Sequence, residues 1–179
     1  MTIATDVLER HGLTVEEYQR IVAALKREPK IATRKPASVV PEAEASRAPA
    51  SVLDASAVMA LLHDEEGSSA VVNAIAAGTT ISVVNWAEVL SKVAGEGDDP
   101  EAVASRLGVT GEEVVIWIEA LTAADCIEVA RLRPITKAQG LSLADRVCLV
   151  LAERMGVPAI TADREWAKAD VAAGVQLIR

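Results

Sequence analysis

Aromatic residues are scarce in this 179-residue chain: they make up 2% of it, and there is no Phe. Because 51% of the residues are hydrophobic all the same, a core can form, and it must consist mainly of Ala, Val, Leu and Ile. A net positive charge is also lacking, since the formal net charge is −8. This excludes a generally basic coat for nucleic acid and adhesion to anionic membranes. It does not exclude a nuclease, because bound cations and a few local Arg or Lys side chains can offset acids at one site.

Cysteine and histidine are rare as well. Cys126 and Cys148 form no C-x-x-C pair, which predicts two buried thiols in a reducing cytoplasm. His11 and His63 are isolated, which excludes a His-based zinc site. No hydrophobic run approaches the roughly 20 residues of a membrane span, and the N-terminus lacks the apolar region of a secretion signal. We therefore expect a cytoplasmic protein that does not contact membranes.

Residues 1–28 predict one appended amphipathic helix. Thr14 and Glu17 have the spacing of a capping box, and Pro29 ends the pattern. One face carries apolar side chains at helical spacing, namely Tyr18, Ile21, Val22 and Leu25. A single helix cannot bury its own apolar face, so we expect it to dock on the main domain, on a partner or on a second copy.

Within that region, residues 8–29 resemble the N-terminal segment of phosphoribosylformylglycinamidine synthase. The resemblance rests on His11-Gly12-Leu13-Thr14-Val15-Glu16-Glu17-Tyr18-Gln19-Arg20-Ile21, followed by Arg27-Glu28-Pro29. Nothing like the catalytic body of that enzyme follows, so the resemblance implies no activity.

Residues 29–50 contain four prolines among Ala, Ser and Glu, without hydrophobic periodicity. This composition predicts a flexible linker. Two interpretations remain open: a solvated tail, or a peptide with Arg34 and Lys35 that folds over an acidic site and inhibits it.

Residues 51–179 predict an α/β domain in which strands and helices alternate. Such alternation favours a mainly parallel sheet with helices on both faces. We expect strands at 52–53, 79–84, 114–118, 158–160 and, at an edge, 175–178, with a helix from Gly111 as an alternative for the third. We expect helices at 57–62 and at 69–77, the second ended by Gly78, a third after a cap at Asn85 and a fourth after the loop 95–100. Two more helices begin at capping boxes. One runs from Thr122 and Asp125 toward Arg133, with Pro134 as the stop, and the other runs from Ser142 and Asp145 to Gly156.

Four acids occupy the carboxyl ends of predicted strands or the first turns of predicted helices: Asp54, Glu88, Asp145 and Asp163. Each alone has an ordinary explanation as a strand terminus, a helix-dipole charge or a cap. In a parallel sheet, however, most such positions fall at one end of the sheet. Converging carboxylates repel one another unless a divalent cation neutralises them, and oxygen ligands favour Mg²⁺ or Mn²⁺ over zinc. Such an ion activates water and stabilises charge that develops on a phosphate.

Five short stretches, in this order and spacing, resemble the PIN-domain ribonucleases, and VapC-type toxins of toxin–antitoxin pairs most closely. They are Asp54-Ala55-Ser56, Asn85-Trp86-Ala87-Glu88-Val89, Gly140-Leu141-Ser142-Leu143-Ala144-Asp145-Arg146, the stretch from Leu151 to Pro158, and Thr161-Ala162-Asp163-Arg164-Glu165-Trp166. The resemblance implies a three-layer α/β/α PIN-like fold over residues 51–179 and a metal-dependent endoribonuclease. It also implies that the four acids are a catalytic quartet for Mg²⁺ or Mn²⁺, with Asp54 and Asp145 as direct or water-mediated ligands. Ser56 and Thr161 would orient carboxylates or waters by hydrogen bonds.

The same resemblance implies partners: a structured RNA such as tRNA, a cognate antitoxin and a second copy in a homodimer. Candidates for phosphate contacts lie near the acids in the sequence, namely Arg146, Arg164, Arg131, Arg133 and Lys137. The three tryptophans, Trp86, Trp117 and Trp166, either pack in the core or stack on a base. The first 50 residues depart from the family pattern, because such toxins begin close to their first strand.

Three alternatives remain open. The domain is a PIN nuclease for RNA processing or DNA rather than a toxin; or it is a catalytically silent PIN-like interaction module; or its own N-terminal tail inhibits it, in which case deletion of residues 1–50 raises activity.

Overall fold

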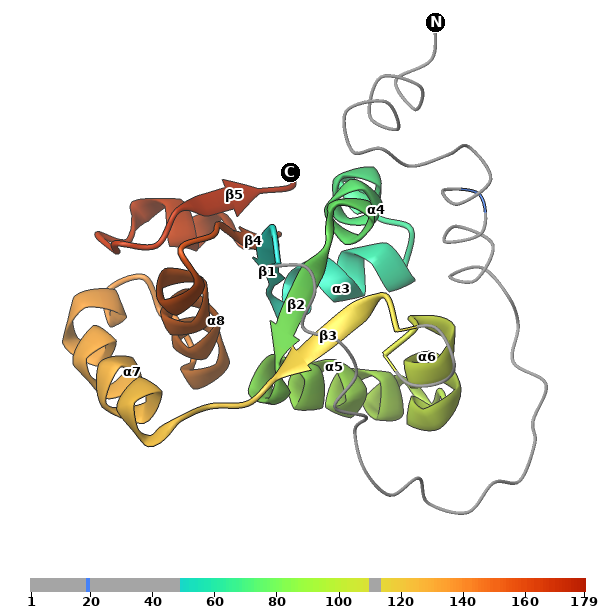
Figure 1. Ribbon diagram of the computed structural model, residues 1–179, viewed down its shortest axis with the longest axis horizontal. Coiled ribbons are helices and arrows are strands. Elements are labelled where there is room, and N and C mark those ends of the chain that lie inside the picture. The colour runs from blue at the N-terminus through green and yellow to red at the C-terminus, as the bar shows by residue number, and fades with distance from the viewer. Residues whose placement is uncertain (1–18, 20–48, 110–113) are drawn as a thin grey trace, which may run out of the picture.

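A computed structural model describes residue 19 and residues 49–109 and 114–179. Its centre is a five-stranded sheet in the order β3-β2-β1-β4-β5, and every neighbouring pair is parallel (Figure 1). The strands are β1 (Ser51–Leu53), β2 (Thr79–Ser82), β3 (Ile116–Glu119), β4 (Ala159–Thr161) and β5 (Val175–Leu177). The predicted parallel sheet is confirmed, and the last strand lies at an edge as expected.

Helices connect the strands, and most begin at a side-chain cap. They are α3 (Ala55–Leu62), α4 (Ser68–Ala77), α5 (Val83–Glu96), α6 (Pro100–Arg106), α7 (Ala123–Thr136), α8 (Leu143–Met155) and the 3₁₀ helix η1 (Arg164–Lys168). Two of the three predicted capping boxes, those at Thr122 and Ser142, lie among the described residues, and both are present, at the starts of α7 and α8. The capping bonds themselves join residues only three apart, which is why the sequence alone predicts them.

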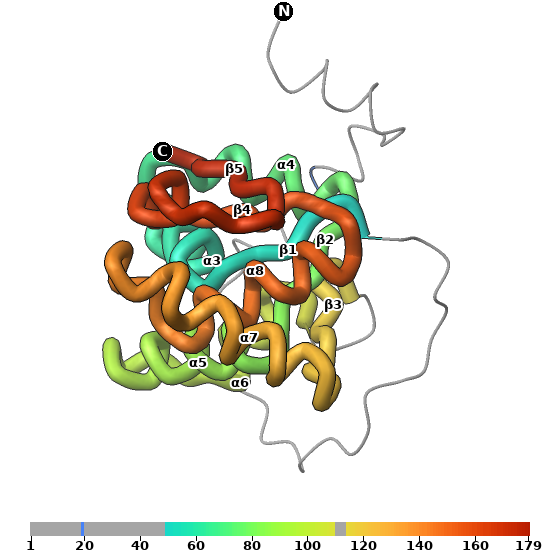
Figure 2. Tube along the Cα trace, turned by 90° about the vertical axis from the view of Figure 1, so that its left-hand side faces the viewer, coloured from blue at the N-terminus to red at the C-terminus, as the bar shows by residue number. Residues whose placement is uncertain are grey.

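Two separate cores cover the two faces of the sheet. Successive strand residues point to opposite faces: Leu53 and Ile160 pack with α3, α4, α5 and α6, whereas Val52 and Ala159 pack with α8. Figures 1 and 2 show α7 and α8 side by side on that second face. The three-layer α/β/α architecture is therefore confirmed.

The start of α5 differs from the prediction. Val83 and Val84 were expected to continue β2 up to a cap at Asn85, but both lie in the first turn of α5, and Ser82 is the N-cap. The Ser82 side chain accepts a hydrogen bond from the backbone N–H of Asn85, at 2.9 Å. This cap begins the helix three residues early and outweighs the weak strand preference of two β-branched residues.

The other differences are smaller. Helix α7 does not stop before Pro134 but runs to Thr136. Pro134 removes one backbone donor, but the Thr136 hydroxyl donates to the Leu132 carbonyl at 2.9 Å and supports the last turn. Helix α5 extends two residues into the expected loop 95–100, to Glu96. Of the two cysteines, Cys148 is buried, but Cys126 is exposed on α7, so that part of the prediction is wrong.

Some predictions concern residues that the structure does not describe. The appended helix 1–28 and the resemblance of residues 8–29 to the synthase lie outside the described residues, except that Gln19 is helical and exposed. Most of the linker 29–50, and the start of the alternative helix at Gly111, lie outside them too. Among the described residues, no helix has both the length and the apolar character needed to span a membrane.

The turn between α3 and α4 is predicted to depend on Gly67. Its φ is +91°, and a Cβ added there would lie 2.5 Å from the Ile178 carbonyl oxygen. We expect Gly67→Ala to lower the free energy of unfolding by about 3 kcal/mol in a urea titration, from backbone strain plus the clash. Gly97→Ala is the matched control, because its φ is also +91°, its ψ of 6° is close to the −7° of Gly67, and a Cβ there would meet no described atom within 4 Å; equal losses in the two variants would show that the clash with Ile178 is absent.

Candidate functional site

Asp54 is held rigidly at the carboxyl end of β1, where it is also the N-cap of α3. Only 2% of its surface is exposed. Its Oδ2 accepts hydrogen bonds from the Ser56 hydroxyl at 2.6 Å, the Ser56 backbone N–H at 3.2 Å and the Thr161 hydroxyl at 3.0 Å. Its Oδ1 accepts from Nδ2 of Asn85 at 3.1 Å. Both oxygens are therefore oriented by the protein before any ligand arrives.

Ser56 and Thr161 connect Asp54 to the carboxyl end of β4. Their hydroxyl oxygens lie 3.0 Å apart. Ser56 Oγ accepts from the backbone N–H of Ala162 at 2.9 Å, and Thr161 Oγ1 accepts from that of Asp163 at 3.1 Å. The hydrogen bonds expected of these two residues are present, and they fix the backbone that carries Asp163 relative to Asp54.

Asn85 is a site residue that the sequence argument missed. It was predicted only as a helix cap, yet it is fully buried and donates to Asp54 from the neighbouring strand–helix junction. The Ser82 hydroxyl donates to Asn85 Oδ1, which leaves the amide nitrogen facing Asp54. The Ser-x-x-Asn spacing after β2 resembles that of a capping box, and this signal could have located Ser82 as the cap and Asn85 inside the helix.

Asp145 is the acid that links the others. As the third residue of α8 it accepts a hydrogen bond from the Ser142 backbone N–H at 2.6 Å through Oδ2. Burial raises the pKa of Asp145 above its usual value, and the charges of Glu88 and Asp163 raise it further. Burial likewise raises the pKa of Asp54; hydrogen bonds from Ser56 oppose this, and the charge of Asp145 adds to it. The structure thus brings the other three predicted acids within electrostatic reach of Asp145.

Glu88 and Asp163 are less buried. Glu88 Oε1 pairs with Lys92 at 2.8 Å, one turn further along α5. Asp163 is the N-cap of η1, and its Oδ1 accepts from the Glu165 backbone N–H at 2.9 Å. The second oxygen of each, like Oδ1 of Asp145, has no hydrogen-bond partner among the described residues. These oxygens are the ones available to a ligand.

The donor set suits a hard cation, but not one enclosed by protein. Within residues 49–109 and 114–179, no three Asp, Glu, His or Cys side chains are close enough together to form a ready-made metal site. Mg²⁺ usually keeps several waters and binds through one or two carboxylates. The four acids therefore fit a hydrated dication that they contact partly through water.

The positive side chains near the site divide into buried and exposed. Arg146 is 7% exposed, and its Nη1 donates to the Leu141 carbonyl at 3.1 Å, across the turn that precedes α8. Burial lowers the pKa of Arg146, and the charge of Arg133 lowers it further. This burial argues against Arg146 as a surface phosphate contact. The other predicted candidates are exposed, namely Arg131, Arg133, Lys137 and Arg164.

Two tryptophans belong to the core. Trp166 is fully buried and Trp86 is 7% exposed, so packing is the role that the structure shows for both. Trp117 is 43% exposed on the edge strand β3. It is the one tryptophan with a face available to a partner.

Comparisons with known proteins agree with this architecture. A family model described as "PIN domain" matches residues 51–172. A chain of a toxin–antitoxin complex from Klebsiella pneumoniae is similar with a TM-score of 0.55 and 16% identity, over 72% of this chain and 98% of that one. A chain of VapBC2 from Rickettsia felis, bound to a DNA fragment from its promoter, is similar with a TM-score of 0.53 and 16% identity, over 71% of this chain and 97% of that one. At these identities the two structures show the fold alone. No match was found among curated proteins.

Proposed function

The chain belongs to the PIN-domain family, and from this we propose that it is a divalent-metal-dependent endoribonuclease and the toxin of a toxin–antitoxin pair. Proteins of this family are nucleases that generally depend on a divalent metal. The observation that carries the proposal is the charge coupling of Asp145 to three other carboxylates at the carboxyl end of a parallel sheet. That is the end at which open α/β sheets bind ligands.

In the proposed reaction, each side chain has a task set by its contacts. A bound Mg²⁺ or Mn²⁺ would supply an activated water and neutralise charge on the scissile phosphate. Asp54 and Asp145 would hold the ion directly or through water. Ser56, Thr161 and Asn85 keep the Asp54 carboxylate in one orientation.

The two remaining acids would act further from the ion. Glu88 and Asp163 would accept hydrogen bonds from its waters or hold a second ion, through the oxygens that have no partner among the described residues. Both belong to the catalytic quartet in this proposal. Because they are half-exposed, they can adjust to the waters without the cost of moving a buried charge.

The partners of the proposed enzyme follow from its surface and its structural neighbours. The exposed cations that would contact RNA phosphates are Arg131, Arg133, Lys137 and Arg164. We propose a structured RNA such as tRNA as the substrate. One structural neighbour is a chain of a toxin–antitoxin complex, which supports an antitoxin as the inhibitor. We also propose a homodimer in the cytoplasm.

The test is digestion of total RNA by the purified protein, with the fragment ends mapped. We expect internal cleavage with Mg²⁺ and none with a chelator. Glu88→Gln should lower the rate about 10- to 100-fold, the usual effect of losing a group that orients metal ligands. Glu66→Gln, at an exposed acid in the α3–α4 turn, is the matched control and should cleave at the normal rate. Cleavage that persists in chelator would refute the metal requirement, and no cleavage under any condition would favour a silent interaction module.

A further inference from the structure

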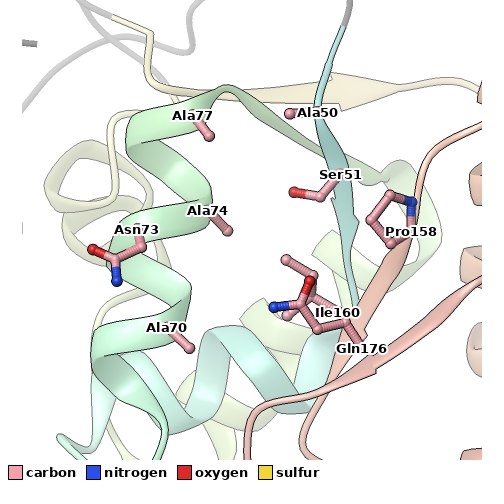
Figure 3. A pocket seen from close by; sticks show the side chains of 9 residues that line it. All are labelled: Ala50, Ser51, Ala70, Asn73, Ala74, Ala77, Pro158, Ile160 and Gln176. Carbon is pink, nitrogen blue, oxygen red and sulfur yellow. The ribbon is translucent and has the colours of Figure 1, made fainter. Parts of the chain in front are cut away.

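A groove lies at the amino end of the sheet, opposite the acids. It has a volume of about 260 Å³ and separates α4 from the starts of β1 and β4 and from β5 (Figure 3). One wall is formed by Ala70, Ala74 and Ala77, and the other includes Ser51, Pro158 and Gln176. The three alanines are spaced four and three residues apart, so they share one face of α4.

The alanine face of α4 is flat enough for a second helix to pack against it. Helices pack by placing the side chains of one between those of the other, and small residues let the two backbones approach closely. Ile160 lines the groove as well, and two amides, on Asn73 and Gln176, border it. The Gln176 side chain points into the groove, whereas the Asn73 side chain points away from it (Figure 3). The groove can therefore take an apolar helix face and bond polar groups at its margins.

We infer that the occupant is this chain's own N-terminal segment, residues 13–28. Its sequence places Tyr18, Ile21, Val22 and Leu25 on one apolar face that cannot be buried within a single helix. Gln19, which is off that face, is helical and exposed. The large side chains of the segment and the small ones of α4 are complementary in size.

The connection between segment and groove favours docking within one chain. Residue 50, where the chain enters β1, itself lines the groove. The 21 residues from Pro29 to Pro49 are predicted to be flexible, and a flexible chain of that length spans about 25 Å on average. Such a tether keeps the segment at an effective concentration of the order of millimolar. A weak intrinsic affinity is then sufficient.

Docking at this groove has a consequence for the acids. The groove adjoins Ser51 and Pro158, where β1 and β4 begin, whereas Asp54 and Asp163 follow the ends of the same strands. A segment bound there leaves the acidic site uncovered. The inference is thus distinct from inhibition by the tail, and it does not depend on the proposed nuclease activity.

Hydrogen–deuterium exchange on the full chain tests the inference. The variant is Val22→Asp, which places a charge in the centre of the apolar face, and the matched control is Gln19→Asp, which places the same charge off it. We expect amides of α4 to exchange about tenfold faster in Val22→Asp than in the wild type, and at the wild-type rate in Gln19→Asp. Equal exchange in all three proteins would overturn the inference.

A second variant addresses the groove itself, and two further outcomes would also overturn the inference. Ala74→Arg should increase exchange in residues 13–28 while leaving that of α8 unchanged. Protection of α4 that rises with protein concentration, together with a doubled mass in light scattering, would make a second copy the occupant. Protection that depends on Val22 but appears at the first turn of α8, around Asp145, would place the segment on the acids instead.

Discussion

We expect Asp145→Asn to remove most of the proposed RNA cleavage and, at the same time, to raise the melting temperature of the metal-free protein. An Asn side chain can still accept the hydrogen bond from the Ser142 backbone N–H, so the cap of α8 is retained. What disappears is a charge that burial disfavours and that Glu88 and Asp163 repel. We expect cleavage to fall about 10³-fold, equivalent to about 4 kcal/mol of lost transition-state stabilisation. In chelator, the Tm should rise by about 3 °C, corresponding to about 1 kcal/mol.

The control for this prediction is Asp170→Asn, at an exposed acid beyond η1, which should change neither quantity. A lower Tm in Asp145→Asn would contradict the account, because it would mean that the carboxylate serves mainly as a structural cap. Retained cleavage would remove Asp145 from the catalytic residues.

Asn85→Asp strongly destabilises the fold. The Asn85 amide donates to Asp54 at 3.1 Å, and both residues are buried. A second carboxylate at that distance replaces a hydrogen bond with repulsion between two desolvated charges, so we expect a loss of about 4 kcal/mol in the free energy of unfolding at pH 7. Since two such carboxylates cannot both ionise easily, their pKa values rise and the folded state binds more protons than the unfolded state. The loss should therefore grow as the pH rises from 5 to 8.

Urea unfolding of the metal-free protein measures this effect. The matched control is Asn73→Asp, the same change of amide to carboxylate at a half-exposed position on α4, which should cost less than about 1 kcal/mol. A similarly small loss in Asn85→Asp would show that Asn85 does not face Asp54.

Sequence patterns predicted those parts of the fold that local interactions decide. The capping boxes at Thr122 and Ser142 are examples, because each needs only residues three apart. The strand–helix boundary at Val83 was misplaced because a single cap at Ser82 outweighed the residue preferences. The long-range bond from Asn85 to Asp54 joins residues 31 apart and depends on how β1 and β2 pair. No local pattern reports such a contact.

The sequence predicted which acids meet at the site, but not how each neighbouring side chain is oriented. That acids at strand ends gather at one end of a parallel sheet follows from topology, and Asp145 joins them because its helix begins there. Arg146 follows Asp145 in the sequence and was predicted to contact phosphate, but helix geometry turns it toward the Leu141 carbonyl and buries it. Neighbours in sequence point in different directions on a helix, so proximity to a motif does not place a side chain in the site.

The central claim is that these carboxylates repel one another and that a bound divalent cation offsets this repulsion. Calorimetric titration of the full chain with Mn²⁺, alongside Asp145→Asn and Asp170→Asn, measures this without RNA. The account predicts saturable binding by the wild type and Asp170→Asn, and at least about tenfold weaker binding by Asp145→Asn. Equal affinity in all three proteins, or no binding by the wild type, would contradict it.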